Sequence, residues 1–335
     1  MRAYRIDSPT GFDALKPVDL PEPKPGPGEV VVGMRAWSLN YRDTIIPRGG
    51  YPRNQTFPVI PLSDGAGEVL AVGPGVTSLR PGDRVAANFM RDWIAGPVSE
   101  AVLRSSLGGG IDGVLAEQVC LPAQSLVPLP SHLSFAEGAT LPCAAVTAWN
   151  ALTSAGTRCG DTVLLLGTGG VSIFALQFAK AAGAKVILTS SSDDKAARAR
   201  ALGADETINY RTHPEWHQEV LKRTGGVGAD LVLEVGGPGT LERSLQSVRV
   251  GGSIALIGLL DPGQQPPNVL PVMLNAQVVR GIYVGSVAMF RDMNRAIELH
   301  SLRPVIDRTF PFAKAREAYE YFASQKHIGK VVIEL

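Results

Sequence analysis

The sequence has little of what marks a secreted, membrane-spanning or nucleic-acid-binding protein. Its three cysteines, Cys120, Cys143 and Cys159, are too few and too far apart for a disulfide framework or a C-x-x-C zinc site. No apolar run approaches the length of a membrane span, and the first ten residues lack the apolar region of a signal peptide. The formal net charge is only +1, so no polyanionic partner is implied. We expect a cytoplasmic protein that binds neither nucleic acid nor a membrane.

The first part of the chain has the pattern of a β-rich domain. The chain has 335 residues, of which 45% are hydrophobic, and this is enough for two domains with a large core. Residues 1–125 contain short strand-like runs separated by turns rich in proline and glycine. We expect strands at Val30–Val32, Met34–Leu39 and Gly65–Gly73, and an irregular glycine-rich excursion at 90–112.

The pattern changes from about Ser134, where apolar runs begin to alternate with helical stretches. Such alternation is typical of βαβ units, which form a parallel sheet with helices on both faces. We assign residues 126–288 to this second, doubly wound α/β domain. Residues 289–335 contain one more helix and a final strand, and we expect them to return to the first domain.

A glycine-rich turn in the second domain predicts a dinucleotide site. The buried run Val163–Leu166 is followed by Gly167, Thr168, Gly169 and Gly170, and a helical pattern starts at Val171. In a strand–turn–helix context, Gly167 permits a tight turn and Gly169 lets the backbone approach a pyrophosphate, which the helix N-terminus favours. The third position of the motif is serine, not glycine. The alternative is an ordinary glycine-rich turn.

The end of the next strand predicts which dinucleotide binds. NAD sites place an Asp or Glu about 20 residues after the glycine turn, to hold the ribose 2′-hydroxyl. Here the strand Lys185–Thr189 ends in Ser190 and Ser191, and Lys195 follows one helical turn later. Hydroxyls and a lysine suit a 2′-phosphate, so we expect NADPH (NADP). The alternatives, a helix N-cap for the serines and a solvated helix face for Lys195, are compatible with this role.

Three further strand ends should frame the nicotinamide, because ligands bind beyond the carboxyl ends of parallel strands. The residues concerned are Val235 and Gly236, Gly258 and Leu259, and Val284. The alternative for the glycines is a role in the turns alone.

Taken together, five motifs resemble the medium-chain dehydrogenase/reductase superfamily, and within it the zinc-free quinone oxidoreductase-like branch. The resemblance covers essentially the whole chain and implies a GroES-like β domain, a Rossmann domain and an active-site cleft between them. The motifs are SLNYRD from Ser38, GAGEV from Gly65, LRPGDRV from Leu79, LPCAAVTAW from Leu141 and GTGGV from Gly167.

The resemblance also implies roles for single residues. In such relatives a serine beside the second strand, a lysine like Lys195 and a tyrosine like Tyr210 grip the 2′-phosphate. By the same resemblance, Thr147 should lie near the nicotinamide and Lys330 near the pyrophosphate, with a surface lysine as the alternative for Lys330. Relatives dimerise through an edge strand, here Val278–Val284, so we expect a homodimer.

The resemblance bears on metal binding as well. Zinc-dependent relatives hold a catalytic zinc with Cys, His and Cys; the matching positions here are Asn40, Ser63 and Cys143. One soft ligand of three does not hold zinc in its usual geometry, so we expect no metal.

A metal-free site needs a substrate that accepts hydride readily. We therefore expect an NADPH-dependent, metal-independent oxidoreductase acting on a quinone or an α,β-unsaturated carbonyl. Asn40 is the candidate to orient or polarise the acceptor oxygen, with Tyr41 and Asp43 beside it. The alternative for Asn40 is a loop residue bonded to its own backbone. Residues 45–55 and 90–112 are expected to line the cleft.

Two other functions stay open from the sequence. One is an alcohol dehydrogenase or aldehyde reductase of the same superfamily, which Asn40 and Ser63 disfavour. The other is a nucleotide-binding regulatory or structural protein with little catalysis, because one scaffold supports several functions.

Overall fold

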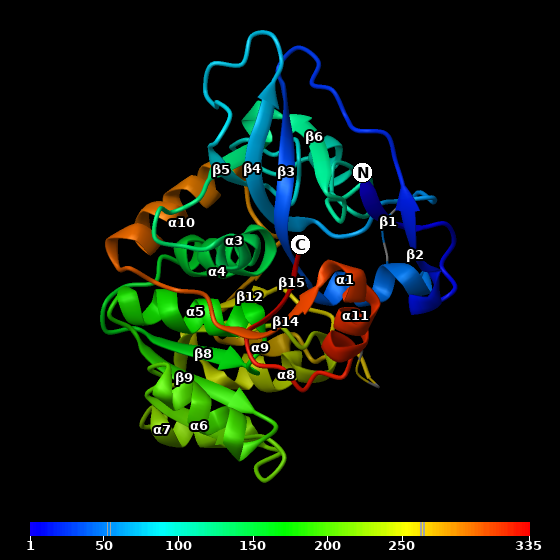
Figure 1. The fold of residues 1–335 in the computed structure, drawn as a ribbon. Coiled ribbons are helices and arrows are strands. Elements are labelled where there is room, and N and C mark those ends of the chain that lie inside the picture. The colour runs from blue at the N-terminus through cyan, green and yellow to red at the C-terminus, as the bar shows by residue number, and fades with distance from the viewer. Residues whose placement is uncertain (52, 54, 262, 264) are drawn as a thin grey trace. The chain divides into compact units, whose positions relative to one another are not determined.

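The computed structural model describes residues 1–51, 53, 55–261, 263 and 265–335, and the chain forms two compact units (Figure 1). Unit 1 comprises Met1–Val146 and Val284–Leu335, and unit 2 comprises Thr147–Tyr283. Pro52 and Asn54, which belong to the expected cleft wall at 45–55, lie outside the described residues. Among those described, no helix combines the length and apolar character needed to cross a membrane.

Unit 1 is built on a seven-stranded sheet in the order β14-β15-β3-β4-β5-β7, with β6 paired to β3, and on a separate ribbon of β1 and β2. Its described strands are β1 Arg2–Ile6, β2 Leu15–Asp19, β3 Glu29–Ser38, β4 Asp64–Val72, β5 Arg84–Ala87, β6 Gln118–Pro122, β7 Leu126–Pro128, β14 Ile306–Pro311 and β15 Lys330–Glu334. Its helices are α1 Tyr41–Ile45, α2 Glu100–Leu103, α3 Phe135–Ala139, α10 Val287–Leu299 and α11 Ala315–Ala323, and a π-helical turn spans Leu141–Ala145.

The register of this sheet brings three distant segments to one end of β3. Ser38, the last residue of β3, pairs with Asp64 at the start of β4 and with Val332 in the middle of the short strand β15, both antiparallel. Because antiparallel neighbours run in opposite directions, the end of β3 meets the beginnings of β4 and β15. Asn40, Asp64 and Lys330 therefore gather at one end of the sheet.

The first unit differs from the sequence expectation in three respects. Glu29–Ser38 is a single strand and not two. The stretch 90–112 is irregular, as expected, except for the short helix α2, and its Leu107 is buried in the core of the unit. The unit extends to Val146, beyond 125, because β7 pairs with β5 and α3 packs against the sheet.

The second boundary lies at Tyr283–Val284 instead of 288–289. The Asn88 side chain donates to the Gly285 carbonyl at 3.4 Å, and the Val287 N–H donates to the Trp93 carbonyl at 2.9 Å. These bonds tie residues 285–287 to unit 1.

Unit 2 is a six-stranded, fully parallel sheet in the order β10-β9-β8-β11-β12-β13. Its described strands are β8 Thr162–Leu166, β9 Lys185–Ser190, β10 Glu206–Asn209, β11 Ala229–Glu234, β12 Val248–Leu256 and β13 Val278–Gly281. The helices are α4 Val146–Ala155, α5 Gly170–Ala181, α6 Asp193–Ala201, α7 Trp216–Arg223, α8 Pro238–Ser247 and α9 Leu270–Leu274. In Figure 1, α5 lies beside β8 and α6 lies next to β9, while α7 packs against β10 and α8.

The strand order of unit 2 is that of a Rossmann sheet, as the alternating pattern predicts. The chain starts at β8, moves outward to β10, then returns to β11 on the other side of β8. The apolar runs fill the middle of the sheet, where Leu164, Ile187 and Val232 are fully buried. The reversal between β8 and β11 creates the switch point at which such sheets bind ligands. The last strand, β13, ends at Gly281 and is shorter than the expected Val278–Val284.

Candidate functional site

A buried polar cluster occupies the end of β3 in unit 1, and Lys330 is at its centre. Lys330 begins β15 and is 2% exposed. Its ammonium donates to the Leu39 carbonyl and to Asn40 Oδ1, both at 2.6 Å. The alternative of a surface lysine is therefore wrong. The ammonium donates to Leu39 and Asn40, and the expected contact with a pyrophosphate stays a prediction.

Asp64 supplies a carboxylate to the same cluster and is fully buried at the start of β4. Its Oδ1 accepts a bond from the Ser63 hydroxyl at 2.8 Å, its Oδ2 accepts one from the Cys143 N–H at 3.2 Å, and Lys330 Nζ lies 4.0 Å from Oδ2. Burial raises the pKa of this carboxyl, and the Lys330 charge opposes the rise.

Asp43 holds the backbone of Asn40 in place. Asn40 precedes α1, and its N–H donates to Asp43 Oδ2 at 2.7 Å, which caps the helix. Asp43 is 2% exposed, and burial raises its pKa to about 6 despite the nearby Arg42 charge. Arg42 is itself buried; it donates to the Leu107 carbonyl at 2.6 Å and lies over the Phe89 ring. The geometry gives Asp43 a positioning role.

Asn40 is the member of the cluster with an unused donor. It is 7% exposed, its Oδ1 accepts from Lys330, and its Nδ2 makes no hydrogen bond with any described residue. The amide lowers the pKa of Asp64, although its nitrogen is outside hydrogen-bonding geometry with that carboxylate. Tyr41 is half-buried at the start of α1, and within the described residues its hydroxyl is not part of the bonded cluster.

The donors at this place do not fit a catalytic zinc. Of the three matching positions, Asn40 offers an amide oxygen that already accepts from an ammonium, and Ser63 a hydroxyl that donates to Asp64. Cys143 alone offers a soft ligand, one of the three that such a zinc needs. Burial, followed by the Asp64 charge, raises the pKa of its thiol well above the usual value. Across the described ranges there is no group of three or more His, Cys, Asp or Glu side chains that could hold a metal.

The glycine turn after β8 fits a dinucleotide. Gly167 has a φ of +73°, which favours glycine, and its N–H donates to Thr189 Oγ1 at 3.2 Å. Gly169 has an ordinary φ, yet a Cβ there would meet no described atom within 4 Å. The protein itself therefore gives no reason for glycine at this position, whereas a closely approaching pyrophosphate does. Thr168 is buried, and Gly170 and Val171 begin α5.

The serine at the third motif position is structural. The Ser172 side chain is buried, and its hydroxyl donates to the Leu166 carbonyl at 2.7 Å. This bond joins the first turn of α5 to the end of β8. It holds the helix against the strand. In the usual motif, a glycine at this position permits the close packing of the two.

The residues expected at the 2′-phosphate lie together in unit 2. β9 and β10 are neighbours, and the Tyr210 N–H donates to the Ser190 carbonyl at 3.0 Å. The Ser190 hydroxyl is buried and bonded to the Ser192 backbone. Ser192 caps α6 by accepting from the Lys195 N–H. Ser191, Lys195 and Tyr210 are each at least partly exposed, so they and not Ser190 offer side chains to a ligand.

Two further strand ends meet at the switch-point side of the sheet. The Gly258 N–H donates to the Glu234 carbonyl at 3.2 Å, and a Cβ on Gly258 would stand 1.8 Å from the Val235 carbonyl oxygen. Glu234 is fully buried, and its carboxylate accepts from the Gly236 and Gly237 N–H groups. The turns after β11 and β12 therefore require glycine for their own packing, which was the alternative given for these glycines. Leu259 is exposed.

Two residues predicted to contact the cofactor lie at the sequence boundaries of unit 2: Thr147 begins the unit, and Val284 directly follows its last residue. Thr147 is the first residue of unit 2 and is 3% exposed. Val284 is the first residue of the second segment of unit 1 and has a φ of +51°. A β-branched residue in the left-handed region is strained, and such strain is concentrated at functional sites.

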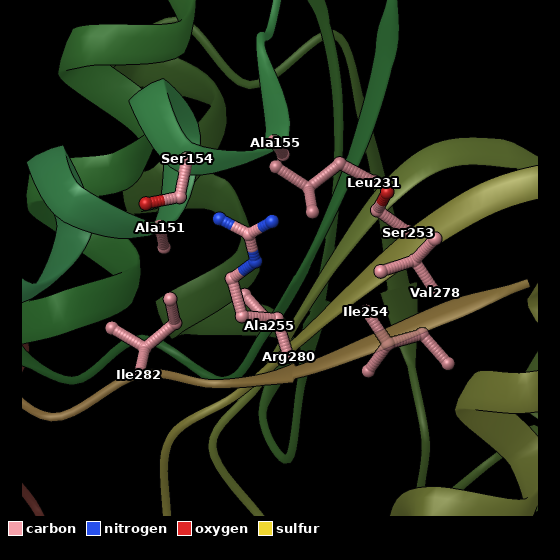
Figure 2. Close-up of a pocket in the computed structure, with 10 residues that line it drawn as sticks. All are labelled: Ala151, Ser154, Ala155, Leu231, Ser253, Ile254, Ala255, Val278, Arg280 and Ile282. Carbon is pink, nitrogen blue, oxygen red and sulfur yellow. The ribbon is translucent and has the colours of Figure 1, made fainter.

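Figure 2 shows a cavity of about 120 Å³ in unit 2 that no sequence motif indicated. Arg280 lines it together with Ser154 and Ala155 of α4, and in this view its guanidinium points toward α4. The lining comes from α4, from Leu231 of β11, from residues 253–255 near the end of β12, and from β13 with Ile282 just beyond it. None of these described lining residues is one predicted to bind the cofactor.

Sequence reasoning missed two buried acids and a cation. Asp64 and Glu234 each collect several donors, and Arg42 lies beside Asp43, but none was chosen from its motif. The available signal was a charged residue next to an otherwise apolar or glycine-rich strand end, where a charge is costly without partners.

Comparison with known families matches each part of the chain. The alcohol dehydrogenase GroES-like domain matches residues 26–131, and the family described as zinc-binding dehydrogenase matches residues 170–300. The chain is 49% identical to a zinc-type alcohol dehydrogenase-like protein of Schizosaccharomyces pombe, over 98% of this chain and 97% of that protein.

Other relatives carry the names of reductases. A quinone oxidoreductase of Pseudomonas aeruginosa is 33% identical, covering 96% of each chain. An acryloyl-coenzyme A reductase of Metallosphaera sedula is 31% identical, over 94% of this chain and 95% of that protein.

Two solved structures differ in the cofactor that their descriptions give. One is an NAD-dependent alcohol dehydrogenase, 36% identical, with a TM-score of 0.91 and full coverage of both chains. Another is a mycobacterial protein solved in complex with NADPH, 28% identical, with a TM-score of 0.84 and full coverage of both chains.

Proposed function

Since the chain belongs to the medium-chain dehydrogenase/reductase superfamily, we propose that it is an NADPH-dependent, metal-independent reductase of quinones or α,β-unsaturated carbonyl compounds. The observation that carries this proposal is the cluster around Asn40. An amide and a serine stand at two of the three zinc-ligand positions, and a buried ammonium is bonded to the amide. Relatives named quinone oxidoreductase and acryloyl-coenzyme A reductase support this substrate class.

In this proposal, a bound nicotinamide supplies the hydride and the chain supplies binding and polarisation. Quinones and conjugated carbonyls accept hydride readily, so a hydrogen-bond donor at the acceptor oxygen replaces a Lewis acid. The Asn40 NH2 is that donor, because its nitrogen is buried and without a partner among the described residues. Asp43 fixes its backbone. We expect Asn40→Ala to lower kcat by about 10²-fold; unchanged turnover removes Asn40 from the mechanism.

The preference for NADPH rests on the end of β9. Within unit 2, Ser191 and Lys195 flank the start of α6, and no Asp or Glu ends the strand. A charged hydrogen bond contributes about 1.5–3 kcal/mol, so Lys195→Ala should weaken NADPH binding about tenfold or more and leave NADH binding unchanged. Arg200→Ala, on the exposed side of the same helix, is the charge-matched control. Equal NADPH affinity in the Lys195 variant and the parent contradicts the assignment.

Turnover by metal-stripped protein tests the proposal as a whole. NADPH oxidation is followed with quinones, enones and simple aldehydes after exhaustive chelation, and the metal content is measured on the same sample. Rapid oxidation with quinones or enones and no metal supports the proposal. Activity that returns only with zinc contradicts it, as does an absence of turnover with every acceptor despite tight NADPH binding; the latter favours a nucleotide-binding role.

A second candidate is an alcohol dehydrogenase or aldehyde reductase. It is favoured by the family described as zinc-binding dehydrogenase and by the NAD-dependent alcohol dehydrogenase of the same fold. It requires a Lewis acid for an unactivated carbonyl, and the Asn40 cluster does not fit zinc. Faster reduction of aldehydes than of enones by the same sample would select this candidate.

We also propose that the chain forms a homodimer through β13. This strand ends the sheet, and Val278 and Val279 on it are exposed, as are Leu270, Met273 and Leu274 of α9. An uncovered apolar edge favours pairing with a second copy. Val278 and Arg280 of this strand also line the cavity of Figure 2. Light scattering should give a dimeric mass, and a monomer at working concentration contradicts the proposal.

A further inference from the structure

We propose that Lys330 is the fixed cation of the Asn40 site: it holds the Asn40 amide by its oxygen, so that the NH2 group is presented to the acceptor oxygen. The inference rests on the proposed role of Asn40 and deepens it. It starts from a bond that joins residues 290 positions apart, Lys330 Nζ to Asn40 Oδ1 at 2.6 Å.

The bond fixes which end of the amide faces the lysine. An ammonium has three donors and no acceptor, so only the amide oxygen can face it. The NH2 group must then point away from Lys330. A donor so bonded through its oxygen is also polarised, because hydrogen bonds in a chain strengthen one another. The lysine therefore sets both the direction and the strength of the Asn40 donor.

The Asn40 NH2 lacks a partner where a partner is expected. Asn40 is 7% exposed, and its Nδ2 makes no hydrogen bond with a described residue. A buried donor left unsatisfied is costly, so such groups require an explanation. The Asn40 nitrogen is therefore a donor available to an incoming oxygen.

The Lys330 ammonium stands where zinc-dependent relatives hold their catalytic zinc, an ion that the donors of this chain do not fit. Lys330 Nζ lies 2.6 Å from the atom at the first ligand position and 4.0 Å from Asp64, next to the second. Its second bond, to the Leu39 carbonyl, anchors it to the end of β3. Lys330 thus supplies the positive charge near the acceptor without a metal, and it acts through Asn40.

A double-mutant cycle separates this positioning role from a structural one. Lys330→Met removes the charge, Lys330→Arg retains it, and each is made in the parent and in Asn40→Ala. In the parent, we expect Lys330→Met to lower kcat about tenfold or more, with Lys330→Arg recovering most of it, while the Kd for NADPH is unchanged. In Asn40→Ala, Lys330→Met should cause no further loss, because the residue acts through the missing amide.

Three results overturn the inference. Equal losses in both backgrounds mean that Lys330 acts independently of Asn40. A raised Kd for NADPH with unchanged kcat means that Lys330 contacts the pyrophosphate. Unchanged kcat in Lys330→Met removes the residue from the site. An inactive parent, by contrast, is a failure of the proposed function, and the inference is then decided by metal binding.

Metal binding tests the cation role without turnover. Asn40→Cys with Ser63→His restores a Cys-His-Cys set together with Cys143. After exposure to zinc and gel filtration, this double variant should hold no zinc, because the ammonium remains. Addition of Lys330→Met should give about one zinc per chain. Stoichiometric zinc with Lys330 intact, or no zinc in either variant, overturns the assignment of Lys330 as the site's cation.

Discussion

The pKa of Asp43 leads to a specific dependence of stability on pH. Burial raises this pKa from 3.8 to about 6, with the Arg42 charge, the Asn40 N–H and the more distant Lys330 opposing and Asp64 assisting. From α11, the buried Tyr319 hydroxyl also faces it. A carboxyl that binds its proton more tightly in the folded protein loses stability as the pH rises between its unfolded and folded pKa values. The loss is complete above pH 6.

The magnitude follows from the shift. About two pKa units correspond to about 3 kcal/mol at neutral pH, of which about 2 kcal/mol appears between about pH 4.5 and about pH 7.5. Asp43→Asn imitates the protonated acid and keeps an acceptor for the Asn40 N–H. Its stability advantage over the parent should therefore grow by about 2 kcal/mol from about pH 4.5 to about pH 7.5. For a unit of this size, the gain is about 4–8 °C in Tm.

The assay is thermal unfolding of the two proteins by circular dichroism across this range, at constant ionic strength. Asp292→Asn, on the exposed surface of α10, controls for a general loss of one negative charge and should show no such trend. A Tm difference between Asp43→Asn and the parent that is the same at every pH would refute the reasoning. So would a parent that gains stability relative to the variant as the pH rises.

Three other substitutions test unit 2. Gly258→Ala places a Cβ against the Val235 carbonyl and should weaken NADPH binding by at least tenfold in a fluorescence titration, while leaving the Asn40 cluster of unit 1 intact. Ser172→Ala removes a buried hydroxyl bonded to the end of β8 and should lower the free energy of unfolding by about 1 kcal/mol in urea. Glu234→Ala leaves several buried donors unpaired and should lower it by about 3 kcal/mol or more; an effect below that of Ser172→Ala contradicts the role of Glu234.

The sequence alone identified features whose causes are local. The strand, glycine turn and helix around Gly167 are contiguous, and the apolar run, the positive φ and the helical periodicity each leave a mark within about 20 residues. The serines in place of an acid after β9 are equally visible, because Rossmann sheets in general bind the dinucleotide ribose at that strand end. Repetition of this strand–turn–helix pattern along the chain predicts the parallel sheet.

Tertiary structure decided the site in unit 1. Asn40 was chosen from its motif, but its partners were not, because Asp64 and Lys330 reach it only through the antiparallel pairing of β3 with β4 and β15. Lys330 illustrates the difference, since its sequence neighbours do not show whether its ammonium is solvated or buried. A lysine can be buried only where acceptors converge on it, and convergence depends on strands almost the whole chain apart.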